Sequence, residues 1–405
     1  MISRPALNAE DFVQESASRF RVHRRVYTDP AVFDLGMRRI FETTWVYIGH
    51  ETEVARAGDY KTTFLGRHPV IMARKPDDNG ISVLFNRCRH RGATVCQQEG
   101  GNANYFRCAY HGWVYNNSGD LVGVTFEEGY APSFDKSQLG LVRVPRVDQY
   151  QGFVFASLSA QGPGLEEHLG NAKPYIDAFA AQGPQGIELT SGVQKFAFQG
   201  NWKLQLENTT DRYHASFLHA SAFQIMERRT GRDIMAGFNP DALKVWDLGA
   251  GHSVCELVSG GGLGSSGGNV SGYSGMRGPG FNINVFPNLA LLFNQVRHIL
   301  PRAVDRTEVR LYLTRLKDVP PEVNAARIRE HESFYGPAGF GAPDDWEIFN
   351  RVNSGLQAED VDWVLMSRGV GREETDGEGR RWNRDLEEAS ARALYRHWLR
   401  LMAEG

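Results

Sequence analysis

The sequence predicts an α+β protein in which an all-β domain precedes a larger mixed domain. Residues 46–160 consist of short apolar or alternating runs separated by Asp-Asn-Gly and Asn-Ser-Gly-Asp turns, a pattern typical of strands. After residue 160 the composition shifts to longer amphipathic helices mixed with strands. A length of 405 residues is compatible with two such domains. The expected divisions are therefore 1–45, a helical N-terminal segment, then 46–160 and 161–405.

Individual elements have their own signals. Residues 31–45 are expected to form a helix, because apolar residues recur at roughly helical spacing after the start signal Asp29-Pro30. The mixed domain is expected to contain paired strands at 289–300 and 307–316, a helix at 322–334, and a C-terminal helix at 386–402 with one apolar face.

A glycine-rich stretch at 259–275 is expected to be a mobile loop. It contains a Gly-x-Gly-x-x-Gly pattern at 262–267, which resembles the phosphate-binding turn of dinucleotide domains. However, no helical pattern follows it, and no acidic residue occurs between Glu256 and Asp305 to bind an adenine ribose. We therefore expect no nucleotide site in this chain.

The composition argues against several classes of function. The formal net charge is −3 with both signs mixed, so no basic surface for nucleic acid is expected. The 4 cysteines are too few for the disulfide framework of a secreted protein. The N-terminus lacks the apolar run of a signal peptide, and no segment approaches the roughly 18 apolar residues of a membrane span. We expect a soluble, cytoplasmic protein that acts on small molecules.

Four residues in the β domain have the spacing of metal ligands: Cys88, His90, Cys108 and His111 form the pattern C-x-H…C-x2-H. Two thiolates and two imidazoles can bind one zinc ion, or a two-iron, two-sulfur cluster with the cysteines on one iron and the histidines on the other. Zinc fingers usually pair like residues, whereas both pairs here are mixed and a glycine follows each. The pattern favours the iron–sulfur cluster and indicates electron transfer.

The mixed domain contains a second candidate metal site around His214 and His219. Two histidines five residues apart point about 140° apart on a regular helix, so the helix must end or distort before His219 if both bind one ion. Non-heme iron(II) oxygenases use two histidines and one carboxylate. Asp345, in Pro343-Asp344-Asp345, is the preferred carboxylate, and Glu359-Asp360 is the alternative. The histidines could instead be buried structural residues, and Asp344 or Asp345 could cap a helix.

Together these motifs resemble the large (alpha) subunit of Rieske non-heme iron aromatic-ring-hydroxylating oxygenases, over essentially the whole chain. The matching pieces are the tetrad, the block Asn-Trp-Lys…Glu-Asn-x-x-Asp-x-Tyr-His-x4-His, and the segment Gly-Pro-Ala-Gly-Phe…Asp-Asp. The resemblance implies a Rieske [2Fe–2S] domain and a catalytic domain with an antiparallel sheet flanked by helices, helix-grip or START-like, on which the N-terminal segment packs. It also implies Fe(2+) bound by His214, His219 and Asp345.

The resemblance further implies an oligomer. In the family, the cluster of one subunit serves the iron of its neighbour in a ring of three, and an aspartate bridges the two centres. By position this is Asp211, while Asn208 is expected near the iron. The implied partners are O2, a separate reductase or ferredoxin, and further copies of the chain as a homotrimer (α3), or α3β3 with a small beta subunit.

The preferred reaction is cis-dihydroxylation of an aromatic carboxylate, because the segments around residues 20–30 and 336–345 look most like the benzoate, anthranilate, salicylate and terephthalate branch. A buried carboxylate needs a partner, and Arg297, or else Arg392, is the expected one. Each could instead be structural or solvated. Ring monohydroxylation and demethylation are the alternatives within the family. A Rieske electron-transfer protein is disfavoured, because it would need little beyond the β domain.

Overall fold

The computed structural model describes residues 11–231, 243–257, 280–384 and 386–403. The chain divides into two compact units: Phe41–Leu165, called here the β unit, and Met1–Ile40 with Glu166–Gly405, called the mixed unit. The sequence predicts these divisions at residues 45 and 160. The glycine-rich stretch 259–275, with its Gly-x-Gly-x-x-Gly pattern, lies outside the described residues.

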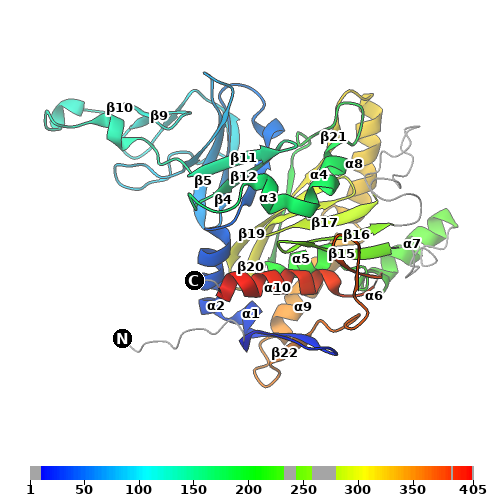
Figure 1. Cartoon of the computed structure of the whole chain (residues 1–405). Helices are drawn as coiled ribbons and strands as arrows, with labels where there is room; N and C mark the ends of the chain where they lie inside the picture. The colour runs from blue at the N-terminus through cyan, green and yellow to red at the C-terminus, as the bar shows by residue number, and fades with distance from the viewer. Residues whose placement is uncertain (1–10, 232–242, 258–279, 385, 404–405) are drawn as a thin grey trace. The chain divides into compact units, whose positions relative to one another are not determined.

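The β unit consists of three antiparallel sheets, as its turn-rich sequence predicts (Figure 1). Their strand orders are β6-β5-β4-β7, β10-β9-β8 and β11-β12-β3. The strands are β3 (Val46–His50), β4 (Asp59–Leu65), β5 (His68–Arg74), β6 (Ile81–Phe85), β7 (Gly100–Asn102), β8 (Tyr105–Arg107), β9 (Val114–Asn116), β10 (Leu121–Gly123), β11 (Arg146–Tyr150) and β12 (Phe153–Ser157).

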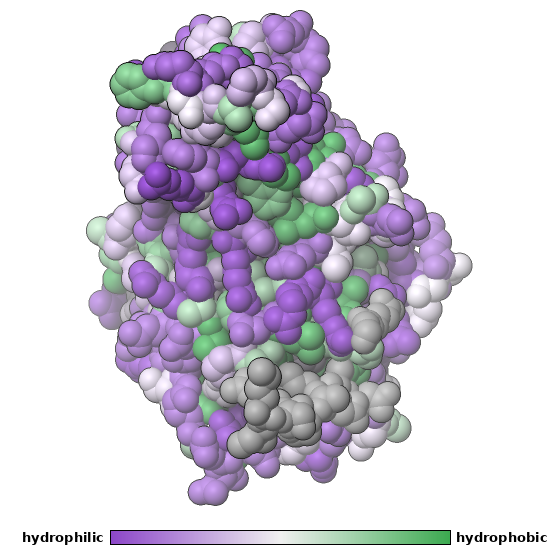
Figure 2. Space-filling view, turned by 90° about the vertical axis from the view of Figure 1, so that its left-hand side faces the viewer, coloured by the Kyte–Doolittle hydropathy of each residue, from purple (hydrophilic) through white to green (hydrophobic). Residues whose placement is uncertain are grey.

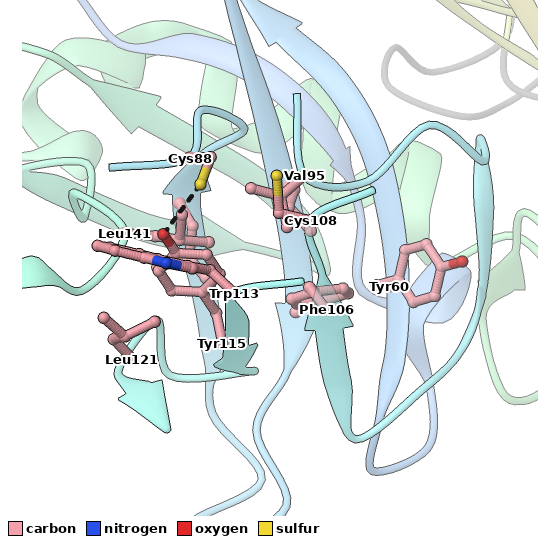
Figure 3. Packing of buried hydrophobic residues seen from close by; sticks show 12 residues of the cluster. Tyr60, Cys88, Val95, Phe106, Cys108, Trp113, Tyr115, Leu121 and Leu141 are labelled. Atoms are coloured by element: carbon pink, nitrogen blue, oxygen red, sulfur yellow. Dashed lines mark hydrogen bonds between the residues drawn. The ribbon is translucent and has the colours of Figure 1, made fainter. Parts of the chain in front are cut away.

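An aromatic core supports the two loops that carry the tetrad. Phe106, Trp113 and Tyr115 are buried in one cluster that also includes Cys88 and Cys108. Figure 3 shows both sulfur atoms on neighbouring loops at the same side of these rings. The packed rings therefore fix the two loops with respect to each other, as a rigid metal site requires.

The mixed unit is built on a nine-stranded antiparallel sheet of order β14-β20-β19-β18-β17-β16-β15-β24-β23. Two small sheets, β1-β2-β22 and β13-β21, accompany it. The strands are β1 (Val13–Glu15), β2 (Phe20–His23), β13 (Ile187–Glu188), β14 (Val193–Gln199), β15 (Leu243–Gly249), β16 (His252–Leu257), β17 (Phe281–Val285), β18 (Leu289–Leu292), β19 (Gln295–Ala303), β20 (Arg306–Leu313), β21 (Arg315–Leu316), β22 (Trp363–Leu365), β23 (Glu374–Thr375) and β24 (Arg381–Arg384).

Helices flank this sheet. The helix α10, red in Figure 1, packs on β15 and β16, while α9 packs on β14 and α5 on β17 and β18. The predicted class, an all-β domain together with a second domain that has a helix-flanked antiparallel sheet, is confirmed. The helices are α1 (Arg25–Thr28), α2 (Pro30–Gly36), α3 (Leu165–Leu169), α4 (Lys173–Ala180), α5 (Lys203–Thr209), α6 (Ala215–Leu218), α7 (Ala220–Thr230), α8 (Pro321–Tyr335), α9 (Ala342–Gly355) and α10 (Ala389–Ala403).

Two element predictions are wrong in detail. The strand expected over 289–300 is two strands, because the chain turns at Phe293, whose φ is +47°. No glycine or proline marks this turn in the sequence, so the apolar residues on both sides look continuous. The helix expected over 31–45 is α2 followed by a π-helical turn, Met37–Phe41, and it ends before Trp45.

The face of the molecule in Figure 2 is mostly hydrophilic, with smaller groups of hydrophobic residues between. Among the described residues, several large exposed hydrophobic side chains adjoin the predicted sites. Phe126 is 78% and Tyr110 58% exposed in the β unit, and Phe217 is 74% exposed in the mixed unit. None of the described helices is long and apolar enough to cross a bilayer.

Candidate active site

The two tetrad loops share one backbone conformation. In the first, the Cys88 N–H donates to the Ala93 carbonyl at 2.8 Å and the Gly92 N–H donates to Cys88 at 3.0 Å. In the second, Cys108 donates to Trp113 at 2.8 Å and Gly112 donates to Cys108 at 2.9 Å. The two glycines have φ of +78° and +72°, a region that residues with a Cβ rarely adopt. The glycine after each histidine is therefore required by the turn, as the sequence predicts.

The side chains of these loops fit a cluster with two thiolate and two imidazole ligands. The rings of His90 and His111 lie 4.6 Å apart between centroids, and His90 stacks on Trp113. Within the described part of the chain, the buried Nδ1 of His90 has no hydrogen-bond partner, and Cys88 and Cys108 are buried thiols outside any disulfide. Burial raises the pKa of the Cys108 thiol, so a thiolate there needs a cation beside it. The donor set is therefore suited to iron binding.

Tyr115 adds a contact that the sequence did not reveal. Its hydroxyl lies 3.3 Å from the sulfur of Cys88 and accepts a hydrogen bond from the Arg89 N–H at 3.1 Å. With its own proton the hydroxyl can donate to a Cys88 thiolate. Hydrogen bonds to ligand sulfurs are one means by which proteins set the potential of an iron–sulfur cluster.

The second centre depends on a broken helix. Helix α6 begins after His214 and ends at His219, where φ is −96° and ψ is 19°, and α7 then starts at once. The break turns His219 back toward His214, as the sequence analysis requires for two histidines that bind one ion. The third residue, Asp345, lies in the first turn of α9.

One ligand atom from each of these three residues lies within 4.8 Å of the others. The Oδ1 atom of Asp345 is 3.6 Å from Nε2 of His214 and 3.3 Å from Nε2 of His219. Burial raises the pKa of Asp345, but the two histidines and Arg297 lower it further, so the net shift is downward and the group is a carboxylate. Two imidazoles and one carboxylate that converge in this way fit a mononuclear iron site.

Further side chains orient these three. Asp211 Oδ2 lies 3.0 Å from Nδ1 of His214, which leaves Nε2 free to face the ion. Asp344 Oδ2 lies 3.5 Å from Nδ1 of His219. Asn208 Nδ2 donates to Asp345 Oδ1 at 3.0 Å and lies 3.2 Å from His214 Nε2. Hydrogen bonds therefore hold His214 and Asp345 in place, while His219 has a carboxylate nearby.

Two alternatives from the sequence are not supported by this geometry. The Glu359 side chain is 85% exposed and lies beside Arg24, and among the described residues the group of possible ligands around His214 and His219 contains Asp345 but neither Glu359 nor Asp360. Asp344 does not cap α9, because the N-cap is Gly341 and no side chain caps the helix. Asp344, the first carboxylate of the pair, instead lies beside His219, a position that sequence spacing alone could not reveal.

Arg297 and Arg392, the two candidates for substrate binding, have opposite surroundings. Arg297 is 2% exposed, and within the described residues its guanidinium donates only from Nε, to Gln295 at 3.0 Å. Arg392 is also buried, but its nitrogens donate to Glu373, to the carbonyls of Met366 and Arg368, and to Asn383. Arg392 is therefore a structural residue, and neither the substrate role nor the solvated helix face considered for it is supported.

A pocket of about 550 Å³ opens beside His214, and of the three ligand candidates His214 alone is among the described residues that line it. Its wall includes Asn208, Asp211 and His214, with apolar side chains such as Leu204 and Phe349. It also includes Glu207, the glutamate of the Glu-Asn-x-x-Asp block, for which the sequence suggested no separate role.

Comparisons with known proteins agree with this geometry. Residues 44–135 match the model of the Rieske [2Fe-2S] domain, and 176–404 match the ring hydroxylating alpha subunit (catalytic domain). The chain is 34% identical to toluate 1,2-dioxygenase subunit alpha of Pseudomonas putida, covering 88% of this chain and 83% of that one. It is 32% identical to 2-halobenzoate 1,2-dioxygenase large subunit of Burkholderia cepacia, covering 87% and 80%.

Among solved structures, naphthalene 1,2-dioxygenase from Rhodococcus sp. bound to indole superposes with a TM-score of 0.83. It is 27% identical and the match covers 95% of this chain and 94% of that one. Both domain matches fall on the units that contain the two candidate centres, so the cofactors are a [2Fe–2S] cluster and a mononuclear iron. The chain belongs to the Rieske-type ring-hydroxylating oxygenases and is an alpha subunit of that family.

Proposed function

We propose that this chain is the terminal oxygenase component that cis-dihydroxylates the ring of an aromatic carboxylate of the benzoate type. Members of its family act with O2 and with electrons from a reductase or ferredoxin. Relatives at 32% and 34% identity are named for 2-halobenzoate and toluate, both aromatic acids. Within this chain, the assignment of the substrate class rests on the environment of Arg297.

Arg297 is a buried cation with few partners among the residues that the structure describes. Of its five N–H donors, one is used within the described residues, and the acceptor is the neutral side chain of Gln295. Its guanidinium lies 5.7 Å from the ring centre of Tyr335, and Asp345 influences its charge only from beyond ion-pair distance. Because a buried charge is costly without a partner, a ligand carboxylate is the expected counter-ion. The aromatic ring of that ligand then lies toward Asp345.

The remaining site residues have separate duties in this proposal. Cys88, His90, Cys108 and His111 hold the cluster, and His214, His219 and Asp345 hold the iron. When bound, the iron activates O2 with electrons that the cluster delivers one at a time. Asp211 orients His214 and couples the two centres, and Asn208 keeps Asp345 in place by donating a hydrogen bond to its carboxylate.

We propose a trimer, α3 or α3β3, in which Asp211 faces a cluster histidine of a neighbouring copy. Exposed aromatic side chains adjoin both centres: Tyr110 next to His111, and Phe217 near His214. Large exposed apolar side chains at a functional site are typical of an interface. Native mass spectrometry of the purified chain, with and without a beta subunit, tests the assembly, and a monomeric active enzyme contradicts it. The cytoplasmic location expected from the sequence stays a prediction.

Product analysis with ¹⁸O₂ tests the reaction. The holoenzyme, supplied with a reconstituted electron source, is given benzoate, 2-chlorobenzoate and the toluates, with toluene as the uncharged control. We expect cis-dihydrodiols that carry two labels from the acids and little product from toluene. One label identifies a monooxygenase, and a preference for toluene contradicts the aromatic-acid assignment.

A further inference from the structure

A polar cluster borders the pocket that His214 lines. It is centred on Glu207, which is half-buried and lines the same pocket as Asn208, Asp211 and His214. Glu207 is separated by one helical turn from Lys203 on α5, and Lys203 is buried. None of the roles proposed above uses either residue. A lysine and a glutamate enclosed beside an oxygen-reducing centre call for a chemical explanation, because charged groups are rarely buried without one.

Two tyrosines hold one oxygen of this glutamate. Tyr27 from α1 donates to Glu207 Oε1 at 3.0 Å, and Tyr395 from α10 donates to the same oxygen. The other oxygen, Oε2, takes no hydrogen bond within the described residues, although the side chain is part of the pocket wall. The tyrosines therefore fix the carboxyl group and leave Oε2 as the atom that can exchange a proton with water in the pocket.

Lys203, one turn earlier on α5, supplies a positive charge that can compensate the Glu207 carboxylate. Its ammonium donates to Asn201 Oδ1 at 2.6 Å and lies 5.0 Å from the ring centre of Trp202 and 6.0 Å from that of Trp398. No carboxylate pairs with the Lys203 ammonium within 4.0 Å among the described residues, and its interaction with Glu207 is a coulombic one through space. This charge can stabilise the carboxylate that remains when Glu207 gives up its proton.

The protonation equilibrium of the cluster suits exchange near neutral pH. Burial raises the pKa of Glu207 to about 7, against the opposing effects of Tyr395, Tyr27 and Lys203, while Glu388 adds to the rise. Burial also lowers the pKa of Lys203 to about 7. Glu207 therefore takes up and releases a proton at little cost in the range where a cytoplasmic enzyme works.

We propose that Glu207 supplies protons to the pocket beside His214 during oxygen reduction, with Tyr27 and Tyr395 positioning its carboxyl group and Lys203 stabilising the carboxylate that is left. This rests on the proposed function, since cis-dihydroxylation joins one arene, one O2, two electrons and two protons to form the diol. The electrons come from the partner through the cluster. For each proton, the O–H bond of Glu207 breaks, the proton passes to pocket water, and the carboxylate is reprotonated from solvent.

The test compares Glu207→Gln with Glu256→Gln in the holoenzyme. Glu256 is a matched control: it is a buried glutamate bonded by Trp246, its pKa is raised by burial, and it does not line the pocket. The first readout needs no turnover. Infrared spectra of the oxidised enzyme across pH should show a protonated carboxyl band that disappears around neutral pH in the wild type and in Glu256→Gln, and that is missing in Glu207→Gln.

The second readout is turnover against pH. A proton donor works when protonated, so wild-type turnover should fall as pH rises above about 7, and this alkaline limb should be absent in Glu207→Gln. Turnover in that variant should drop on the order of 10²-fold, the range for loss of general acid catalysis. Its iron content, cluster signal and rate of cluster reduction should match Glu256→Gln, which should stay close to wild type.

If Glu207→Gln does not fold, Tyr395→Phe replaces it. Removing one hydrogen bond to the carboxylate should raise the pKa of Glu207, so the infrared midpoint and the alkaline limb should both move to higher pH. An infrared titration unchanged by these variants, or equal turnover in Glu207→Gln and Glu256→Gln, overturns the proposal. It fails separately from the proposed function, which is contradicted by single-label products or by a preference for uncharged substrates, whatever Glu207 does.

Discussion

Replacing Arg297 with methionine should separate substrate recognition from stability. Methionine has a similar length and no charge, so it keeps much of the packing around Tyr335 while it removes the only cation assigned to the substrate carboxylate. The variant Arg297→Lys is the companion, because it keeps the charge but loses the planar fork that binds a carboxylate through two hydrogen bonds.

The expected loss follows from the burial of this side chain. Arg297 is 2% exposed, and within the described residues no carboxylate lies within 4.0 Å of it, so little solvent or protein charge can replace it. A hydrogen bond to a charged group contributes about 1.5–3 kcal/mol, and a buried charge left without its partner costs about 3–5 kcal/mol. At about 1.4 kcal/mol per factor of ten, kcat/KM for benzoate should fall roughly 10²–10³-fold.

The free energy of unfolding should respond to Arg297→Met differently from kcat/KM. Burying a guanidinium costs desolvation free energy, and a single hydrogen bond to a neutral partner offsets little of that cost. Removing the guanidinium should therefore leave the free energy of unfolding unchanged or raise it. The assay is steady-state kinetics with benzoate and toluene, together with thermal unfolding of the loaded enzyme. A variant that loses stability and keeps the wild-type ratio of kcat/KM for the two substrates would show that Arg297 is structural, and the substrate assignment would fall.

The remaining predictions concern the two centres and the sheet. Asp345→Ala should lose iron while keeping the cluster spectrum, whereas Asp211→Ala should keep both metals and lose turnover. Metal analysis and product yield distinguish the two variants. Normal product formation by the metal-loaded Asp211 variant contradicts the coupling role. Tyr115→Phe removes the hydroxyl 3.3 Å from the Cys88 sulfur, so the cluster potential should fall by roughly 40 mV, the equivalent of one hydrogen bond. An unchanged potential in redox titration excludes that bond. Burial lowers the pKa of His252 to about 4, from 6.5. As pH falls below 6.5, the unfolded chain takes up a proton on this histidine while the folded chain does not. The free energy of unfolding should therefore be unaffected above pH 6.5 and should fall by about 3 kcal/mol as pH decreases to about 4. Unfolding of His252→Gln should show a shallower dependence on pH, and an equal slope argues against this histidine.

The prediction of the metal ligands rests on patterns that span only a few residues of the sequence. The spacing of Cys88, His90, Cys108 and His111 and the glycine after each histidine are set by loops of a few residues, and Gly92 and Gly112 adopt the positive φ that this requires. The histidine spacing also indicated that the helix breaks before His219, because a regular helix cannot turn both rings to one ion. The ligand spacing, the turn glycines and the helix break all depend on residues that are close together in the chain, so they can be predicted from the sequence.

Turns without a glycine or proline signal were not predicted. Phe293 takes a positive φ and divides β18 from β19 because the sheet forces the reversal, whereas its own residue type disfavours it. Tertiary pairing overrides local preference at such positions, and a single sequence records only the preference.

The sequence by itself determined the α+β class, the order of the β and mixed domains, and the residue types that can hold two metal centres. Only the tertiary structure distinguished the two candidate arginines, since Arg392 meets a carboxylate and three further acceptors while Arg297 meets one neutral amide. It also brought Tyr27, Lys203, Glu207 and Tyr395 together from three helices distant in the chain. The physical reason is that burial and partners decide what a charged side chain does, and both come from contacts between segments that no local pattern specifies.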